Sequence, residues 1–184
     1  RLAEIIKGKS GEKSVGIPSL SPVWMLVISV FQAILVGGTF NVPFMFGEEF
    51  GWRGLLLKET QHWGFLGSSL FIGVIWGLWH WPLIVMGHNY PHYPYKGILM
   101  MCLFTIAIAP LFSYVRIKSK TILGPCLLHG MVNATAGLFL LYVANGDELF
   151  GSIAGIAGVV SGLAVTAGIY LLDKNFIRTF KNPE

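Results

Sequence analysis

Two adjacent carboxylates, Glu48 and Glu49, and an arginine, Arg53, stand within the stretch GEEFGWRG at positions 47–54. The residues on both sides of this stretch are almost entirely apolar. A charged side chain inside a bilayer costs at least ~3 kcal/mol, so it usually faces a partner or a polar cavity. Three such groups therefore predict either a salt-bridge cluster or a reactive site.

The spacing of these groups predicts two different roles. Glu49 and Arg53 are four residues apart, so they share a helix face and can pair. Glu48 points about 100° away from Glu49 on a helix and has no local partner. We therefore expect a structural ion pair at Glu49–Arg53 and a reactive carboxylate at Glu48. The alternative is that all three form one buried or interfacial salt-bridge cluster.

Two histidines in later apolar segments are candidate partners for Glu48. His80 lies in WGLWHWP (76–82), where Pro82 removes a helical hydrogen bond and favours a break beside the histidine. His129 and Asn133 are one turn apart on one helix face. Taken singly, each has a structural explanation, as a packed histidine or as an interhelical hydrogen-bonded pair. Their occurrence together with the acidic motif, each on its own expected helix, favours one shared site.

The composition indicates the elements that must position these residues. Of 184 residues, 54% are hydrophobic and 12% are charged, whereas about 25% is usual in soluble domains. The mean hydropathy is +0.65. These values predict an all-α, polytopic transmembrane bundle of about five to six helical segments, with a polar site buried within the membrane. The net charge of +4 lies in loops and ends, so nucleic acid is not an expected partner.

The order of segments predicts three parts. Residues 1–21 are expected to be a polar surface segment, the end of a longer chain, and residues 174–184 a basic tail. Between them, a helix is expected to begin at Ser21-Pro22. Gly37-Gly38 and Pro43 leave open whether one kinked helix or two elements reach residue 58. The later expected spans are 63–86, 97–115, 121–144 and 150–172.

Other patterns are expected to serve structure. Cys102 and Cys126 lie in apolar runs and are expected to pack. The loop at 87–96 is expected at the membrane interface, with tyrosines at headgroup level; the residues assigned there are Tyr90, Tyr93, Tyr95, His88 and His92. Small residues in the last span have the spacing of close helix contacts; they are Gly151, Gly155, Gly158 and Gly162.

Three motifs together resemble those of the CPBP family, the CAAX-processing and bacteriocin-processing intramembrane proteases. GEEFGWRG resembles the EExxxR motif of that family, and residues 76–80 resemble FxxxH with Trp in place of Phe. His129 to Asn133 resembles HxxxN. The motifs occur in family order, and the resemblance spans roughly residues 24–141. The GEExGWRG form resembles a bacterial branch, which implies a multi-pass protein of the bacterial plasma membrane.

The resemblance implies an intramembrane endopeptidase domain over residues 22–173, whose substrate is a membrane-associated or lipidated peptide or protein. Glu48 and His80 would activate a water molecule, and His129 and Asn133 would stabilise the oxyanion. Arg53 would hold Glu49 and orient the first motif. Burial strengthens a carboxylate base, and preorganised donors are worth more where little water competes.

Alternative functions remain open from the sequence. In a metal-dependent version, Glu48, His80 and His129 would bind zinc; the metal-free version, with no cofactor, is favoured. No HExxH or GxSxG motif occurs, and Asp173 is the only aspartate in or bordering a span. A non-catalytic membrane protein that binds a bacteriocin or a partner as an immunity factor or scaffold is the main alternative. A transporter with Glu48 as proton relay would need a longer polar path. The sequence does not predict an oligomeric state.

Overall fold

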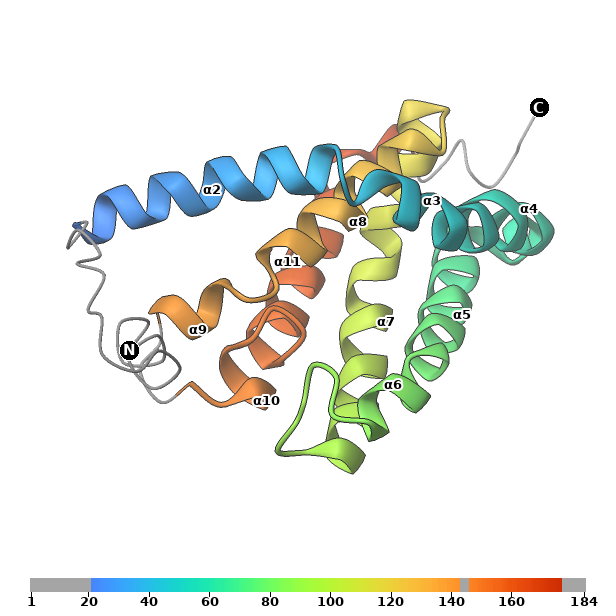
Figure 1. The fold of residues 1–184 in the computed structure, drawn as a ribbon. Helices are drawn as coiled ribbons and strands as arrows, with labels where there is room; N and C mark the ends of the chain where they lie inside the picture. The colour runs from blue at the N-terminus through green and yellow to red at the C-terminus, as the bar shows by residue number, and fades with distance from the viewer. Residues whose placement is uncertain (1–20, 143–145, 177–184) are drawn as a thin grey trace, which may run out of the picture.

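The computed structural model describes residues 21–142 and 146–176. The predicted N-terminal surface segment, except Ser21, and most of the predicted basic tail lie outside these ranges. Within them every regular element is a helix and there is no strand (Figure 1). The predicted all-α fold is confirmed.

The first apolar stretch forms two elements, which resolves the question left open by Pro43. Helix α2 (Pro22–Gly38) begins where predicted, and the Ser21 hydroxyl accepts a hydrogen bond from the backbone N–H of Trp24. After a short turn, α3 (Val42–Glu49) starts with Pro43 in its first turn. Because the chain turns between them, α2 lies along α8 (Leu123–Thr135) while α3 leads toward the acidic motif (Figure 1).

The acidic motif ends in a widened helical turn. Directly after Glu49, the chain forms the π-helix η1 (Phe50–Leu56) and then α4 (Leu57–Thr60). Single π-turns within α-helices are rare and frequent at functional sites. The sequence pattern gives no sign of this turn. A short 3₁₀ turn, η2 (Gln61–Trp63), follows.

Helix α5 (Gly64–Trp79) begins at a glycine with φ of 79°, a conformation that favours glycine. It ends at Trp79, and after His80 the helix α6 (Trp81–Val85) follows with Pro82 in its first turn. The predicted break beside the histidine is therefore present.

Close backbone contact fixes α5 against α7 (Pro94–Ser119). A Cβ added at Gly73 would lie 2.7 Å from the Cα of Ile106, and one at Gly77 would lie 2.6 Å from the Cα of Cys102. The Thr105 hydroxyl donates to the Gly73 carbonyl at 2.8 Å. These glycines have the small-xxx-small spacing that permits close helix contact. Such contacts were expected only in the last span.

Both late spans are interrupted, contrary to the continuous helices expected. Helix α8 is followed by a turn and then α9 (Leu138–Tyr142). In the last span, α10 (Glu148–Gly151) and α11 (Ile156–Leu172) are separated by residues 152–155.

The glycines of the last span divide between contact and bend. Gly162 lies close to α7, as expected, with Ala107 nearby, whereas a Cβ at Gly158 would meet first the Ile153 carbonyl in the bend and then Phe104 of α7. The expected contact role of the Gly151–Gly155 pair is wrong, because Gly155 lies in the bend. A Cβ there would be 2.7 Å from the Glu148 carbonyl oxygen.

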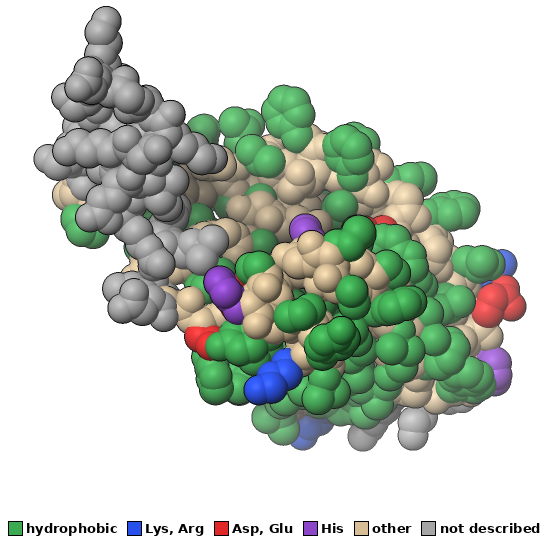
Figure 2. Space-filling view, turned by 60° about the horizontal axis from the view of Figure 1, so that its bottom comes forward, with side chains coloured by type: hydrophobic (Ala, Val, Ile, Leu, Met, Phe, Trp, Pro, Cys, Tyr) green, Lys and Arg blue, Asp and Glu red, His purple; other side chains and the backbone are tan. Residues whose placement is uncertain are grey.

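Among the described residues, three stretches are long and apolar enough to cross a membrane: Val42–Val85, Pro94–Ser119 and Glu148–Leu172. Large apolar side chains are also widely exposed, including Phe31 at 67% and Leu172 at 88%. Figure 2 shows apolar side chains over much of one face of the molecule, with few charged ones among them. Because water would disfavour such a surface, the chain is an integral membrane protein.

The loop between α6 and α7 is tied to α10 and the bend after it. Tyr90 is fully buried and donates its hydroxyl to the Ala154 carbonyl, and this burial raises its pKa. The expected headgroup position is therefore wrong for Tyr90. Tyr93 donates its hydroxyl to Asp147 at 2.6 Å, and this bond lowers the pKa of Asp147. Tyr95, by contrast, is 80% exposed.

Candidate active site

Three charged or titratable side chains form a buried ion cluster, defined as Glu49, Arg53 and His129. Arg53 Nη1 donates to both carboxylate oxygens of Glu49, at 3.0 and 3.1 Å. His129 Nδ1 lies 2.9 Å from Glu49 Oε1. Their exposed fractions are 0%, 1% and 3%. The ion pair expected from the spacing is present, and it extends across to α8.

Aromatic rings enclose the guanidinium of this cluster. The Arg53 guanidinium carbon lies 4.5 Å from the ring centres of both Trp76 and Phe112. The same rings meet the His129 imidazole edge to face, at 5.1 and 5.7 Å between centroids. Cation–π attraction is strongest where water is absent, so the rings partly replace the solvation that Arg53 loses on burial.

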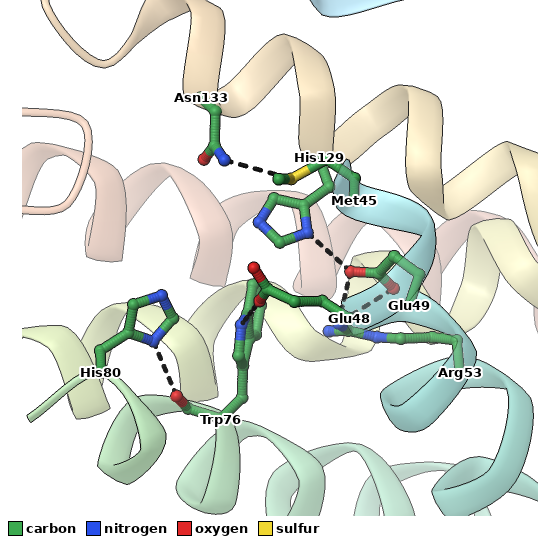
Figure 3. A network of polar contacts seen from close by, with 8 residues as sticks. All are labelled: Met45, Glu48, Glu49, Arg53, Trp76, His80, His129 and Asn133. Carbon is green, nitrogen blue, oxygen red and sulfur yellow. Dashed lines mark hydrogen bonds and ion pairs between the residues drawn. The ribbon is translucent and has the colours of Figure 1, made fainter. Parts of the chain in front are cut away.

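Glu48 points away from the ion cluster and has a hydrogen-bond partner that is distant in the sequence. The indole N–H of Trp76 donates to Glu48 Oε2 at 3.1 Å. Within the described residues, Oε1 makes no hydrogen bond. The carboxylate therefore has one oxygen fixed by the protein and one available to a ligand (Figure 3).

The helix break at residue 80 orients the His80 ring. The amide of His80 donates to the Gly77 carbonyl at 3.2 Å, a tighter turn than an α-helix makes. Nδ1 of the ring lies 2.8 Å from the Trp76 carbonyl oxygen, which only accepts hydrogen bonds, so Nδ1 carries the proton. The neutral ring therefore has an unprotonated Nε2 on its other side.

Asparagine contacts join α3 to α8. Asn133 donates its side-chain amide to Met45 Sδ at 3.2 Å. Asn41, in the turn before α3, donates to the Gly130 carbonyl at 3.0 Å. Because Gly130 follows His129 directly, this bond fixes the position of α3, and so of Glu48 and Glu49, along α8 relative to His129.

One pocket gathers four of the six predicted site residues. It has a volume of about 360 Å³, and Glu48, His80, His129 and Asn133 line it. Figure 3 shows the Glu48 carboxylate between the two imidazole rings, with Asn133 beyond His129. The other two, Glu49 and Arg53, are fully buried behind the pocket wall.

The pocket is also lined by residues outside the predicted site. The most consequential is Trp76, which was predicted only as part of a motif. A buried indole N–H usually has a hydrogen-bond partner, and this property could have marked Trp76 as a partner of a polar site residue. His88, assigned to the interface, lines the pocket with Asn89. Ser152 and Ile153, from the bend between α10 and α11, form another part of the wall. No sequence pattern marks these loop residues.

The alternative zinc site requires Glu48, His80 and His129 to converge on one ion. Within the part of the chain that the structure describes, no three His, Cys, Asp or Glu side chains are placed to hold one metal ion. Glu48 is turned to Trp76, and His129 Nδ1 to Glu49. A three-ligand zinc site would need one free atom of each of these side chains to reach a common ion position, and the described side chains do not gather around one.

The fold and the pocket together define a helical integral membrane protein with a polar pocket enclosed by apolar helices. Residues 18–135 match the family model described as type II CAAX prenyl endopeptidase Rce1-like. The chain therefore belongs to this family of endopeptidases, and the predicted family membership is confirmed.

A curated relative supports the same assignment. The chain is 26% identical over 120 residues to CAAX prenyl protease 2 of Methanococcus maripaludis. The aligned part is 62% of this chain and 42% of that protein, so the chain spans less than half the length of this relative. No solved structure matches the chain.

Proposed function

We propose that this protein is an intramembrane endopeptidase that hydrolyses a peptide bond of a membrane-associated or lipidated substrate in the pocket. The observation that carries the proposal is the convergence of Glu48, His80, His129 and Asn133, from three helical segments, on one pocket of about 360 Å³. Membership of a family of endopeptidases supports it. The reaction needs only these side chains and water.

Glu48 and His80 are the water-activating pair. Oε1 of Glu48 and Nε2 of His80 have no other partner among the described residues, so each has capacity to accept a proton from water. Glu48 takes a proton from the water as the oxygen attacks the carbonyl carbon of the scissile bond. General-base assistance of this kind typically contributes 10²–10⁴-fold to the rate.

His129 and Asn133 are the donors to the oxyanion. His129 donates a hydrogen bond from Nδ1 to Glu49, so Nδ1 carries a proton. Its Nε2 can therefore also donate only when the ring is an imidazolium, with Glu49 as its counter-ion. Asn133 has two amide protons and gives one to Met45. One N–H from each residue is then available to stabilise the negative oxygen.

Collapse of the tetrahedral intermediate completes the reaction. The carbon–nitrogen bond breaks, and the proton held by Glu48 passes to the leaving nitrogen. The products are a carboxylic acid and an amine, which become a carboxylate and an ammonium when the acid's proton passes to the amine, and Glu48 returns to its ionised form. No proton, electron or co-reactant beyond one water molecule is needed.

We further propose that the substrate carries a prenyl group near the scissile bond. The curated relative is named a CAAX prenyl protease, and the pocket wall is largely apolar beside its four polar groups. The apolar residues that form it include Leu83, Met101, Phe104, Val132 and Phe139. Such a wall favours a hydrocarbon chain over a fully polar peptide.

The test is cleavage of a synthetic peptide ending in a prenylated CAAX sequence by the intact protein in lipid vesicles, with products identified by mass spectrometry. We expect His80→Gln to lose at least about 10²-fold in cleavage rate, the lower range of general-base contributions. His62→Gln is the matched control, because His62 is exposed and does not line the pocket. It should cleave at the unchanged rate.

Two outcomes would contradict the proposal. Cleavage at the unchanged rate by folded His80→Gln would remove this residue from the chemistry. Binding of the peptide without cleavage by the unaltered protein would instead favour the non-catalytic immunity or scaffold role. A peptide without the prenyl group, tested in parallel, reports separately on the substrate class.

A further inference from the structure

We propose that Trp76 is a positioning residue that orients the Glu48 carboxylate, and this inference rests on the proposed function. Its indole N–H, at 3.1 Å from Oε2, is the one hydrogen bond that the carboxylate receives within the described residues. By fixing Oε2, it turns Oε1 toward the pocket (Figure 3). Trp76 itself does not need to touch the substrate.

The indole has little freedom to move. Trp76 is 2% exposed, and its ring is packed against the Arg53 guanidinium on one side of the cluster. Phe112 and His129 meet it edge to face, at 5.3 and 5.1 Å between centroids. A side chain locked by packing directs its polar group precisely enough to hold a reacting group in place. The ion cluster therefore supports Glu48 indirectly, through this ring.

The indole nitrogen is a feature of this chain rather than of the motif it resembles. The FxxxH motif has phenylalanine at this position, whose ring has no N–H to donate. The carbonyl contact from Trp76 to His80 is made by the backbone and would persist with either residue. Trp76→Phe thus removes the bond to Glu48 while it retains an aromatic ring and the His80 contact.

The first measurement is the separation of kcat from KM for Trp76→Phe with the prenylated peptide. We expect kcat to fall about 10- to 100-fold, the range for a lost hydrogen bond to a charged group, with KM unchanged. Trp63→Phe is the control, because Trp63 is 51% exposed beside Phe71 and should keep both constants. An unchanged kcat in Trp76→Phe would overturn the inference.

A second measurement needs no activity. Unfolding of Trp76→Phe, Glu48→Ala and the double variant forms a double-mutant cycle. A direct bond predicts coupling of about tenfold in the unfolding equilibrium constant. Coupling below about twofold overturns the inference whether or not the protein cleaves peptides. Clear coupling without cleavage by the unaltered protein would support the Trp76–Glu48 contact and overturn the proposed function alone.

Discussion

The two halves of the polar region differ in how accessible their side chains are. The buried ion cluster of Glu49, Arg53 and His129 is almost inaccessible, and its members bind one another. The pocket group of Glu48, His80 and Asn133 is partly accessible, and each member has polar atoms facing a cavity. Adjacent glutamates belong to different halves because a helix separates neighbouring residues by about 100°.

This difference separates the polar groups that hold the helices from those that face the pocket, and His129 belongs to both, because its Nδ1 binds Glu49 while its ring lines the pocket. A buried ion pair loses solvation and gives little net stability, but removing one partner leaves an uncompensated charge. The cluster therefore fixes η1 against α8. Polar atoms left facing a cavity need another explanation, and binding of water and substrate provides one.

The largest effect should come from breaking the ion cluster. Arg53→Met removes the partner of Glu49 and leaves a carboxylate with no exposed surface. We expect a loss of about 3–5 kcal/mol in the free energy of unfolding. Chemical denaturation in detergent measures it, with exposed Lys58→Met as control. Equal stability of the two variants would show that the cluster does not hold the fold.

A packing change beside the cluster should have an intermediate effect. In Gly130→Ala, the new Cβ would lie 2.1 Å from the Gly37 carbonyl oxygen, so α2 and α8 must separate. We expect a cost of about 1–3 kcal/mol, the usual range for overpacking. Gly38→Ala is the matched control, because nothing lies within 4 Å of its Cβ. If both variants unfold alike, close α2–α8 contact is not needed.

An accessible ion pair provides a reference for the buried one and should have a smaller effect. The Lys118 ammonium donates to Asp173 at 2.8 Å, and this bond lowers the pKa of the aspartate. Its stabilising contribution is fully present above the unfolded pKa of about 3.9 and is lost as pH falls through the lower folded value.

Asp173→Asn should therefore lower stability slightly near pH 7, and the difference from the unaltered protein should vanish in strong acid. Thermal unfolding at several pH values measures this. A loss as large as that of Arg53→Met would contradict the distinction between buried and accessible pairs.

Metal removal should have the smallest effect. Because the described His, Cys, Asp and Glu side chains do not gather around one ion position, we expect dialysis against a strong chelator to leave the cleavage rate within about twofold. Full loss of cleavage, restored by added zinc, would favour the metal-dependent alternative and require rearrangement of the pocket group.

The sequence predicted those features that depend on local spacing. The Glu49–Arg53 pair, the helix start at Ser21 and the break beside His80 follow from helix periodicity and proline chemistry. The polar residues of the three motifs also meet as expected. Their spacing within each helix, and the resemblance to a known family, were sufficient for this.

Features that depend on contacts between distant segments were missed. The π-turn after Glu49 adds one residue to a helical turn and has no sequence signature. The bond from Trp76 to Glu48 joins residues 28 positions apart. Tyr90 was expected at headgroup level, but its burial depends on the bend before α11. Such contacts are set by tertiary packing, which local patterns do not contain.

The most direct test compares the two adjacent glutamates in one preparation. Glu48→Gln and Glu49→Gln should be measured side by side for cleavage of the prenylated peptide and for free energy of unfolding. We predict that Glu48→Gln stays folded with near-unaltered stability and loses cleavage at least about 10²-fold, whereas Glu49→Gln is clearly destabilised. A folded Glu48→Gln that cleaves at the unaltered rate would contradict the account.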